Sequence, residues 1–106
     1  MPATFIALWG KPSDVEGFDR HYRTTHMEIV RRWPKVQSHV LIRVTGSPVG
    51  GEVPYHQIFV ATFATQEDLK EGLRSPAMAE AGRDAMEMVR RFGGGLTVLT
   101  GLQEET

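Results

Sequence analysis

The stretch TFIALW at residues 4–9 is apolar at every position after its first threonine. The stretch YHQIFVATF at residues 55–63 also has apolar side chains at both odd and even positions. A strand with one face on the core and one face in water would alternate between apolar and polar residues. These two stretches therefore predict strands of a sheet that is covered on both faces.

Two further strands and two helical segments surround this pair. Residues 36–45 (VQSHVLIRVT) alternate with a period of two, and residues 96–100 (LTVLT) follow three glycines. Residues 46–54 contain three glycines and two prolines, which predicts a long hairpin loop between the second and third strands. The resulting order of strand, helix, strand, strand, broken helix, strand predicts the α+β class, with a ferredoxin-like βαββαβ arrangement on an antiparallel sheet.

The first helix is predicted to begin at Ser13, because Glu16 follows it at the spacing of a capping box. Pro34 ends the pattern. Between them, apolar and aromatic residues recur at steps of three and four: Val15, Phe18, Tyr22, His26, Ile29 and Trp33. This spacing places all six on one helical stripe that faces the core.

The second helical segment is predicted to be broken in two. Thr65 is a typical N-cap for a short helix over residues 66–74, and Ser75 followed by Pro76 predicts the start of a longer one. The glycines at 93–95 end that helix. Its predicted buried stripe is Met78, Ala81, Ala85, Val89 and Phe92.

In this arrangement the helices cover one face of the sheet and leave the other face bare. The 106 residues form one domain over residues 1–106, and a chain of this size has a small core. Exposed apolar surface costs roughly 25 cal/mol per Å². We therefore expect a homodimer in which two copies pack sheet against sheet.

Composition excludes several classes of function. The net charge of -1 predicts no binding to nucleic acid or to a membrane surface, and the absence of cysteine excludes disulfides and thiolate metal sites. No apolar run is long enough to span a bilayer, so a cytoplasmic protein is expected. A histidine metal site is not expected either, because His21 and His26 are five positions apart rather than the four that align side chains on a helix. The predicted hairpin sets His56 opposite Val44, several residues from His39.

His26 is the strongest candidate for a functional residue, since it stands within the apolar stripe of the first helix. Burial lowers the pKa of an imidazole and favours a neutral ring that accepts a proton. The alternative is a core histidine bound to a backbone carbonyl. Tyr22, one turn earlier, is a candidate hydrogen-bond donor, and its alternative is plain packing.

Four other large side chains are candidate walls of a ligand site: Trp9, Phe18, Trp33 and Met86. Each of them is equally suited to ordinary core packing. The sequence holds no Gly-Xaa-Ser-Xaa-Gly elbow and no dinucleotide fingerprint, and the glycines at 93–95 follow a helix rather than open one. We therefore expect neither a nucleotide nor any other cofactor.

The ordered motifs of the chain resemble those of the EthD-like proteins. In the first half the resemblance rests on Phe18, His21-Tyr22, His26 and Ile29-Val30. In the second half it rests on Phe63, residues 67–73, Ser75-Pro76, Asp84 and GGLTVLTG at residues 94–101. The resemblance implies a dimeric α+β barrel with a pocket between sheet and helices in each subunit, and it implies that His26 matches a recurring helix histidine of the family.

Two functions are the main candidates at this point, and a structural interaction protein without a pocket is a third alternative. The first is a cofactor-independent enzyme or binder for a small apolar or cyclic compound, with His26 as proton acceptor and Tyr22 as donor. Similar barrels include monooxygenases, isomerases, lyases and cyclases, so the resemblance leaves the reaction type open. The second is a non-catalytic accessory or ligand-carrier protein of a catabolic pathway, in which His26 serves only the core.

Overall fold

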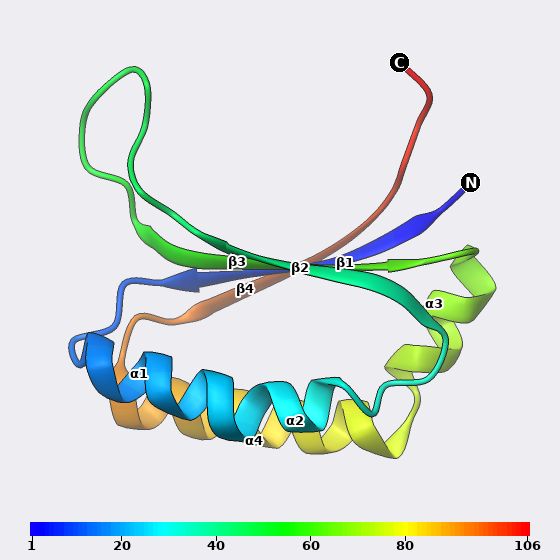
Figure 1. The fold of residues 1–106 in the computed structure, drawn as a ribbon, viewed down its shortest axis with the longest axis horizontal. Helices are drawn as coiled ribbons and strands as arrows, with labels where there is room; N and C mark the ends of the chain where they lie inside the picture. Colours follow the sequence, from blue (N-terminus) through cyan, green and yellow to red (C-terminus); the bar gives the residue numbers. More distant parts are fainter.

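The computed structural model describes residues 1–106 and contains one four-stranded antiparallel sheet. In chain order the elements are β1 (Ala3–Gly10), α1 (Val15–His21), η1 (Tyr22–His26), α2 (Met27–Val30), β2 (Val36–Arg43), β3 (Tyr55–Phe63), α3 (Gln66–Leu73), α4 (Pro76–Phe92) and β4 (Leu96–Leu102). The strand order is β2-β3-β1-β4, and the helices lie on one side of the sheet (Figure 1). The predicted ferredoxin-like α+β fold is confirmed. None of the helices is both long and apolar enough to cross a bilayer.

The caps and the hairpin register follow the sequence closely. The hydroxyl of Thr65 accepts a hydrogen bond from the backbone of Asp68 at 3.1 Å, and the hydroxyl of Ser75 accepts one from Met78 at 3.1 Å. Both residues are N-caps, as predicted. The Val44 N–H donates to the His56 carbonyl at 3.0 Å, which confirms the predicted pairing of that hairpin.

The start of the first helix differs from the prediction. Asp14 is the N-cap, because its carboxylate accepts the Gly17 N–H at 3.0 Å. The hydroxyl of Ser13 instead donates to the carbonyl of Phe92 at 3.0 Å and ties the helix start to the end of α4. Val15, predicted to be buried, is 43% exposed, so the buried stripe begins at Phe18.

A π-helical turn, η1, interrupts this helix between α1 and α2. Across the interrupted helix, four of the buried residues are spaced by four: Phe18, Tyr22, His26 and Val30. Side chains spaced by four drift about 40° per step around an α-helix of 3.6 residues per turn. A π turn is wider, so it reduces this drift and keeps the four side chains facing the sheet.

The core lies between the sheet and the helices. It is rich in aromatic rings that meet edge to face, such as Phe5 with Trp33 at 5.0 Å and Trp9 with Phe18 at 5.3 Å between ring centroids. Such pairs add to the stabilisation from buried area. The inner faces of β1 and β3 supply Phe5, Ala7, Trp9, Phe59, Ala61 and Phe63.

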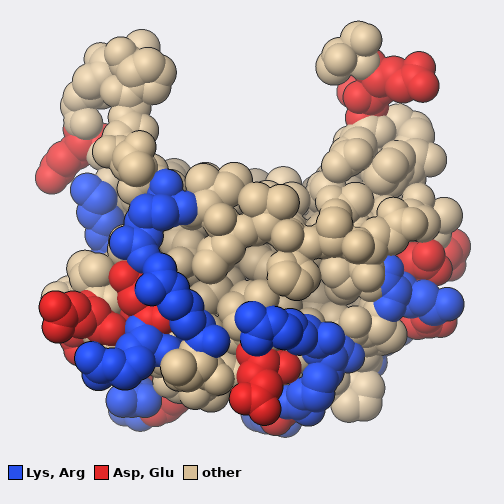
Figure 2. All heavy atoms as spheres, viewed as in Figure 1, with Lys and Arg blue, Asp and Glu red and all other residues tan.

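The opposite face of the sheet has no helix on it, and the side chains at its centre are aliphatic. We call this surface the outer sheet face. Strand pairing aligns its side chains in two rows, Val40–Val60–Ile6–Leu99 and Ile42–Ile58–Leu8. Figure 2 shows an uncharged hollow on this side, between the rising hairpin loop and the C-terminal residues, whereas charged side chains gather around the helices. The two-sided apolar sheet predicted from the sequence is thus present in the subunit.

The end of β1 and the loop before β4 pass so closely that glycine is required at both Gly10 and Gly94. Gly94 has φ +93°, and a Cβ atom there would lie 2.6 Å from the Gly10 carbonyl oxygen. We expect Gly94→Ala to lower the free energy of unfolding by about 2 to 3 kcal/mol through strain and overlap. Gly95 has φ +88° but open space around it, so Gly95→Ala should cost only about 1 kcal/mol. Urea denaturation of both variants measures the difference, and equal losses would contradict the role of the close approach.

Candidate functional site

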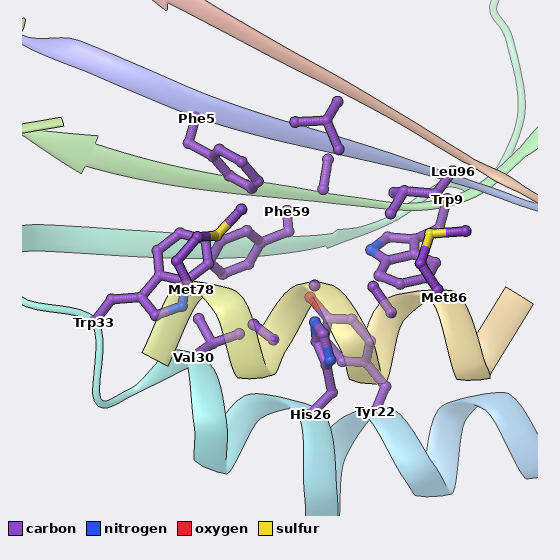
Figure 3. Close-up of a pocket in the computed structure, with 15 residues that line it drawn as sticks. Phe5, Trp9, Tyr22, His26, Val30, Trp33, Phe59, Met78, Met86 and Leu96 are labelled. Carbon is purple, nitrogen blue, oxygen red and sulfur yellow. The ribbon is translucent and has the colours of Figure 1, made fainter. Parts of the chain in front are cut away.

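A cavity of about 190 Å³ lies between the inner face of the sheet and the helices (Figure 3). Thirteen of its fifteen lining residues are hydrophobic, and no lysine or arginine is among them. Met86 and Val98 line the cavity and are 62% and 46% exposed, respectively. The cavity therefore opens between α4 and β4.

Most of the predicted site residues meet at this cavity. Trp9, Tyr22, His26, Trp33 and Met86 all line it. Phe18 does not belong to the wall: its ring is fully buried, stacked on the Tyr22 ring at 5.9 Å. Phe18 thus supports a wall residue from behind and does not itself line the cavity.

Asp84 of α4 determines which nitrogen of the His26 ring carries the proton. The Nδ1 atom of His26 lies 2.8 Å from the carboxylate Oδ2 of Asp84. A carboxylate only accepts hydrogen bonds, so Nδ1 carries the proton and donates it. The other nitrogen, Nε2, then holds a lone pair, and the imidazole stands beside the phenol of Tyr22 at the cavity wall (Figure 3). The partner of His26 is therefore a carboxylate, not the backbone carbonyl considered as the alternative.

His21 contacts the same carboxylate. Its Nε2 lies 2.8 Å from Oδ1 and 3.1 Å from Oδ2 of Asp84. The expectation that a spacing of five keeps His21 and His26 apart was wrong, because η1 follows His21 and its wider turn brings the two rings onto one partner. No group of three or more His, Asp or Glu side chains is arranged to hold a metal ion.

The electrostatics of the site favour a proton acceptor, His26, beside a hydrogen-bond donor, Tyr22. Burial lowers the pKa of His26 below its ordinary 6.5, the bond and charge of Asp84 offset only part of this effect, and the charge of His21 lowers the pKa further. Burial raises the pKa of the Tyr22 phenol well above its ordinary value. Near pH 7 the imidazole is therefore neutral and the phenol keeps its proton.

Asp84 is the site residue that the sequence reasoning missed as a functional group. It stands three positions after Ala81 and one before Ala85, so a carboxylate borders the apolar stripe of α4. Charged side chains at such positions are paired when they are buried. A carboxylate that borders an apolar helical stripe is therefore the sequence signal that could have identified Asp84.

The other two histidines lie outside the cavity. The Nε2 atom of His56 is 2.9 Å from Asp19, which also accepts a hydrogen bond from Arg43 at 2.9 Å. Burial raises the pKa of Asp19, but these bonds and charges outweigh it and leave the pKa below its ordinary value. His39 packs its ring on Phe59 at 5.9 Å. Asp19, Arg43 and His56 together join α1 to β2 and β3.

The bond from His26 to Asp84 leads to a prediction about titration. In Asp84→Asn the charge that raises the pKa of His26 is lost, while the burial that lowers it remains. We expect the His26 imidazole of this variant to titrate at a lower pH than in the native protein. Two-dimensional NMR of the ring resonances measures both midpoints, and an unchanged or higher midpoint would contradict the geometry described here.

Solved structures show the same fold across the whole chain. An ethyl tert-butyl ether D (EthD) family protein from Bacillus halodurans superposes with a TM-score of 0.86 at 29% identity, covering 98% of this chain and 100% of that one. A dimeric ferredoxin-like protein of unknown function from Jannaschia gives a TM-score of 0.72 at 17% identity, covering 97% and 100%. SnoaB, a cofactor-independent oxygenase from Streptomyces nogalater, gives 0.68 at 13% identity, covering 99% and 95%.

The sequence itself identifies the family. No functionally curated protein has a significantly similar sequence. Residues 11–91, however, match the EthD domain, and this segment includes the helix with His21 and His26 as well as Asp84 of α4. The match covers most of the 106 residues and agrees with the similarity to the Bacillus halodurans protein. The chain therefore belongs to the EthD family.

Proposed function

We propose that this protein is a homodimer in which each subunit binds a small uncharged ring compound and uses His26 to accept a proton from it. The observation that carries the proposal is the arrangement of His26 at the cavity wall. Asp84 holds Nδ1 at 2.8 Å, so the lone pair on Nε2 is free for a ligand. A neutral imidazole near pH 7 in an apolar cavity is suited to general-base catalysis without a metal.

The cavity supports a ligand of about one or two fused rings. Its volume of about 190 Å³ exceeds the roughly 150 Å³ at which an apolar cavity in a protein takes up benzene. Its walls are aromatic and aliphatic and carry no cationic side chain. A carboxylate or phosphate group would lose its hydration there without gaining a counter-charge, which favours an uncharged ligand.

The homodimer is supported by the outer sheet face. Val40, Ile42 and Leu99 on this face are 53%, 43% and 49% exposed in the single subunit. A contiguous aliphatic surface of this kind is typical of a protein interface. The Jannaschia protein of the same fold is described as dimeric, which agrees with two sheets packed face to face. SnoaB, described as a cofactor-independent oxygenase, supports chemistry without a cofactor on this fold.

Ligand binding is tested by filling the cavity from α4. Gly82 lines the cavity, and a Cβ atom added there meets nothing within 4 Å. We expect indane, a fused two-ring hydrocarbon, to shift the NMR signals of the cavity residues saturably in the native protein. Gly82→Leu should abolish these shifts, because its side chain occupies the space that the ligand needs.

Gly82→Ala is the matched control for this experiment. It adds one methyl group, should retain indane binding and should gain up to about 1 kcal/mol of stability from its helix propensity. Thermal unfolding checks that both variants are folded. Binding of indane to Gly82→Leu as tightly as to the native protein, or no binding to the native protein, would contradict the proposed site.

A further inference from the structure

Two buried hydrogen-bond donors at the cavity have no partner. The indole nitrogens of Trp9 and Trp33 are both buried, neither makes a hydrogen bond of normal geometry, and both residues line the cavity. The Trp9 N–H faces the Tyr22 phenol, whose pKa it lowers slightly, without forming such a bond. Most buried N–H groups in folded proteins are paired, and leaving one unpaired costs about 1 to 3 kcal/mol. An unpaired donor at a cavity wall is explained when a bound ligand brings the missing acceptor.

The surroundings of the two indoles differ. The ring centroid of Trp9 lies 5.7 Å from those of Tyr22 and His26, which are 5.0 Å from each other. One end of the cavity thus gathers the Trp9 N–H, the Tyr22 O–H and the Nε2 acceptor of His26. Trp33 lies at the opposite end, near Val30, Phe59 and Met78 (Figure 3).

We infer that the ligand is a ring ketone whose carbonyl oxygen accepts hydrogen bonds from Trp9 and Tyr22, while His26 takes a proton from the adjacent carbon. This inference rests on the proposed function and narrows its substrate class. Trp9 and Tyr22 are then the residues that select a carbonyl-bearing ring over a plain hydrocarbon of the same shape. A site built to donate hydrogen bonds discriminates against analogues that lack the acceptor.

The proton transfer balances without a further reactant. The α-carbon loses its proton to Nε2 of His26, and the electron pair of the C–H bond forms a carbon–carbon double bond. The carbonyl π electrons move to the oxygen, which becomes an enolate stabilised by the two donors. The imidazolium is stabilised by the carboxylate of Asp84 and returns a proton to the carbon in the reverse step.

The experiment compares two probes of nearly equal shape, indane and 1-indanone, which differ by the carbonyl oxygen. We expect the native protein to bind 1-indanone about tenfold more tightly than indane. The preference is measured as the ratio of the two dissociation constants. In Trp9→Phe and Tyr22→Phe, which each remove one donor and keep a ring, this ratio should fall at least threefold. The ratio within one variant is insensitive to general loosening of the pocket.

Trp33→Phe is the matched control, because it removes the other unpaired indole N–H at the far end of the cavity. Its ratio of the two dissociation constants should remain that of the native protein. Equal affinity of the native protein for both probes, or an equal loss of the ratio in Trp33→Phe, would overturn the ring-ketone inference and leave the proposed ligand site standing. Failure of the native protein to bind either probe would overturn the proposed function itself.

Discussion

Replacing Val60 with glutamate is expected to convert the protein from a dimer to a monomer at micromolar concentrations. Val60 lies at the centre of the outer sheet face, paired with Ile6 on one side and Val40 on the other. In a sheet-to-sheet dimer each glutamate would be buried among aliphatic side chains without a counter-charge. Such a charge costs at least about 3 kcal/mol, which raises the dissociation constant a hundredfold or more for each copy.

Val15→Glu is the matched control for this prediction. It makes the same substitution at a valine that is 43% exposed on the helical side, away from the outer sheet face. Sedimentation velocity over a range of concentrations should show a dimer for the native protein and for Val15→Glu. A native protein that sediments as a monomer at high concentration would contradict the homodimer, and so would a Val60→Glu variant that remains dimeric.

Local patterns in the sequence were sufficient to predict the fold. Thr65 and Ser75 act as N-caps because their hydroxyls reach backbone donors three residues later, which is a contact within one helical turn. The strands at 4–9 and 55–63 were identified from their apolar composition, and their two apolar faces indicated the bare side of the sheet. These features depend on neighbours in the chain, so a single sequence contains them.

The central contact of the site depends on distant residues and could not be read from the sequence. Asp84 is 58 positions from His26 and 63 from His21, and it reaches both only because α4 packs against the first helix. The π turn η1 is also needed for this shared contact, since a regular α-helix would point the two histidine side chains in different directions. No local pattern distinguished a π turn from an α-helix in YRTTH, so the spacing rule for α-helices led to the wrong expectation.

His26→Gln is expected to abolish catalysed proton exchange while the protein remains folded. In D2O the native protein should speed the exchange of the α-protons of 1-indanone, because neutral His26 removes them and solvent returns deuterium. Glutamine can keep a hydrogen bond to Asp84 but cannot accept a proton near pH 7. General-base catalysis typically contributes about 10² to 10⁴ in rate, so the exchange rate followed by proton NMR should fall by that factor.

The pH dependence of this exchange tests the direction in which the pKa of His26 is shifted. The active form is the neutral imidazole, so the rate should rise with pH through the pKa of His26 and then become constant. Because burial holds that pKa below 6.5, the half-maximal rate should fall below pH 6.5, and lower still in Asp84→Asn. His39→Gln, which removes an imidazole outside the cavity, should leave rate and profile unchanged.

If His26 serves only the core, His26→Gln should instead lose about 1 to 3 kcal/mol of stability, with an exchange rate equal to that of the native protein. An unchanged rate in folded His26→Gln thus excludes the proton acceptor and favours a ligand carrier.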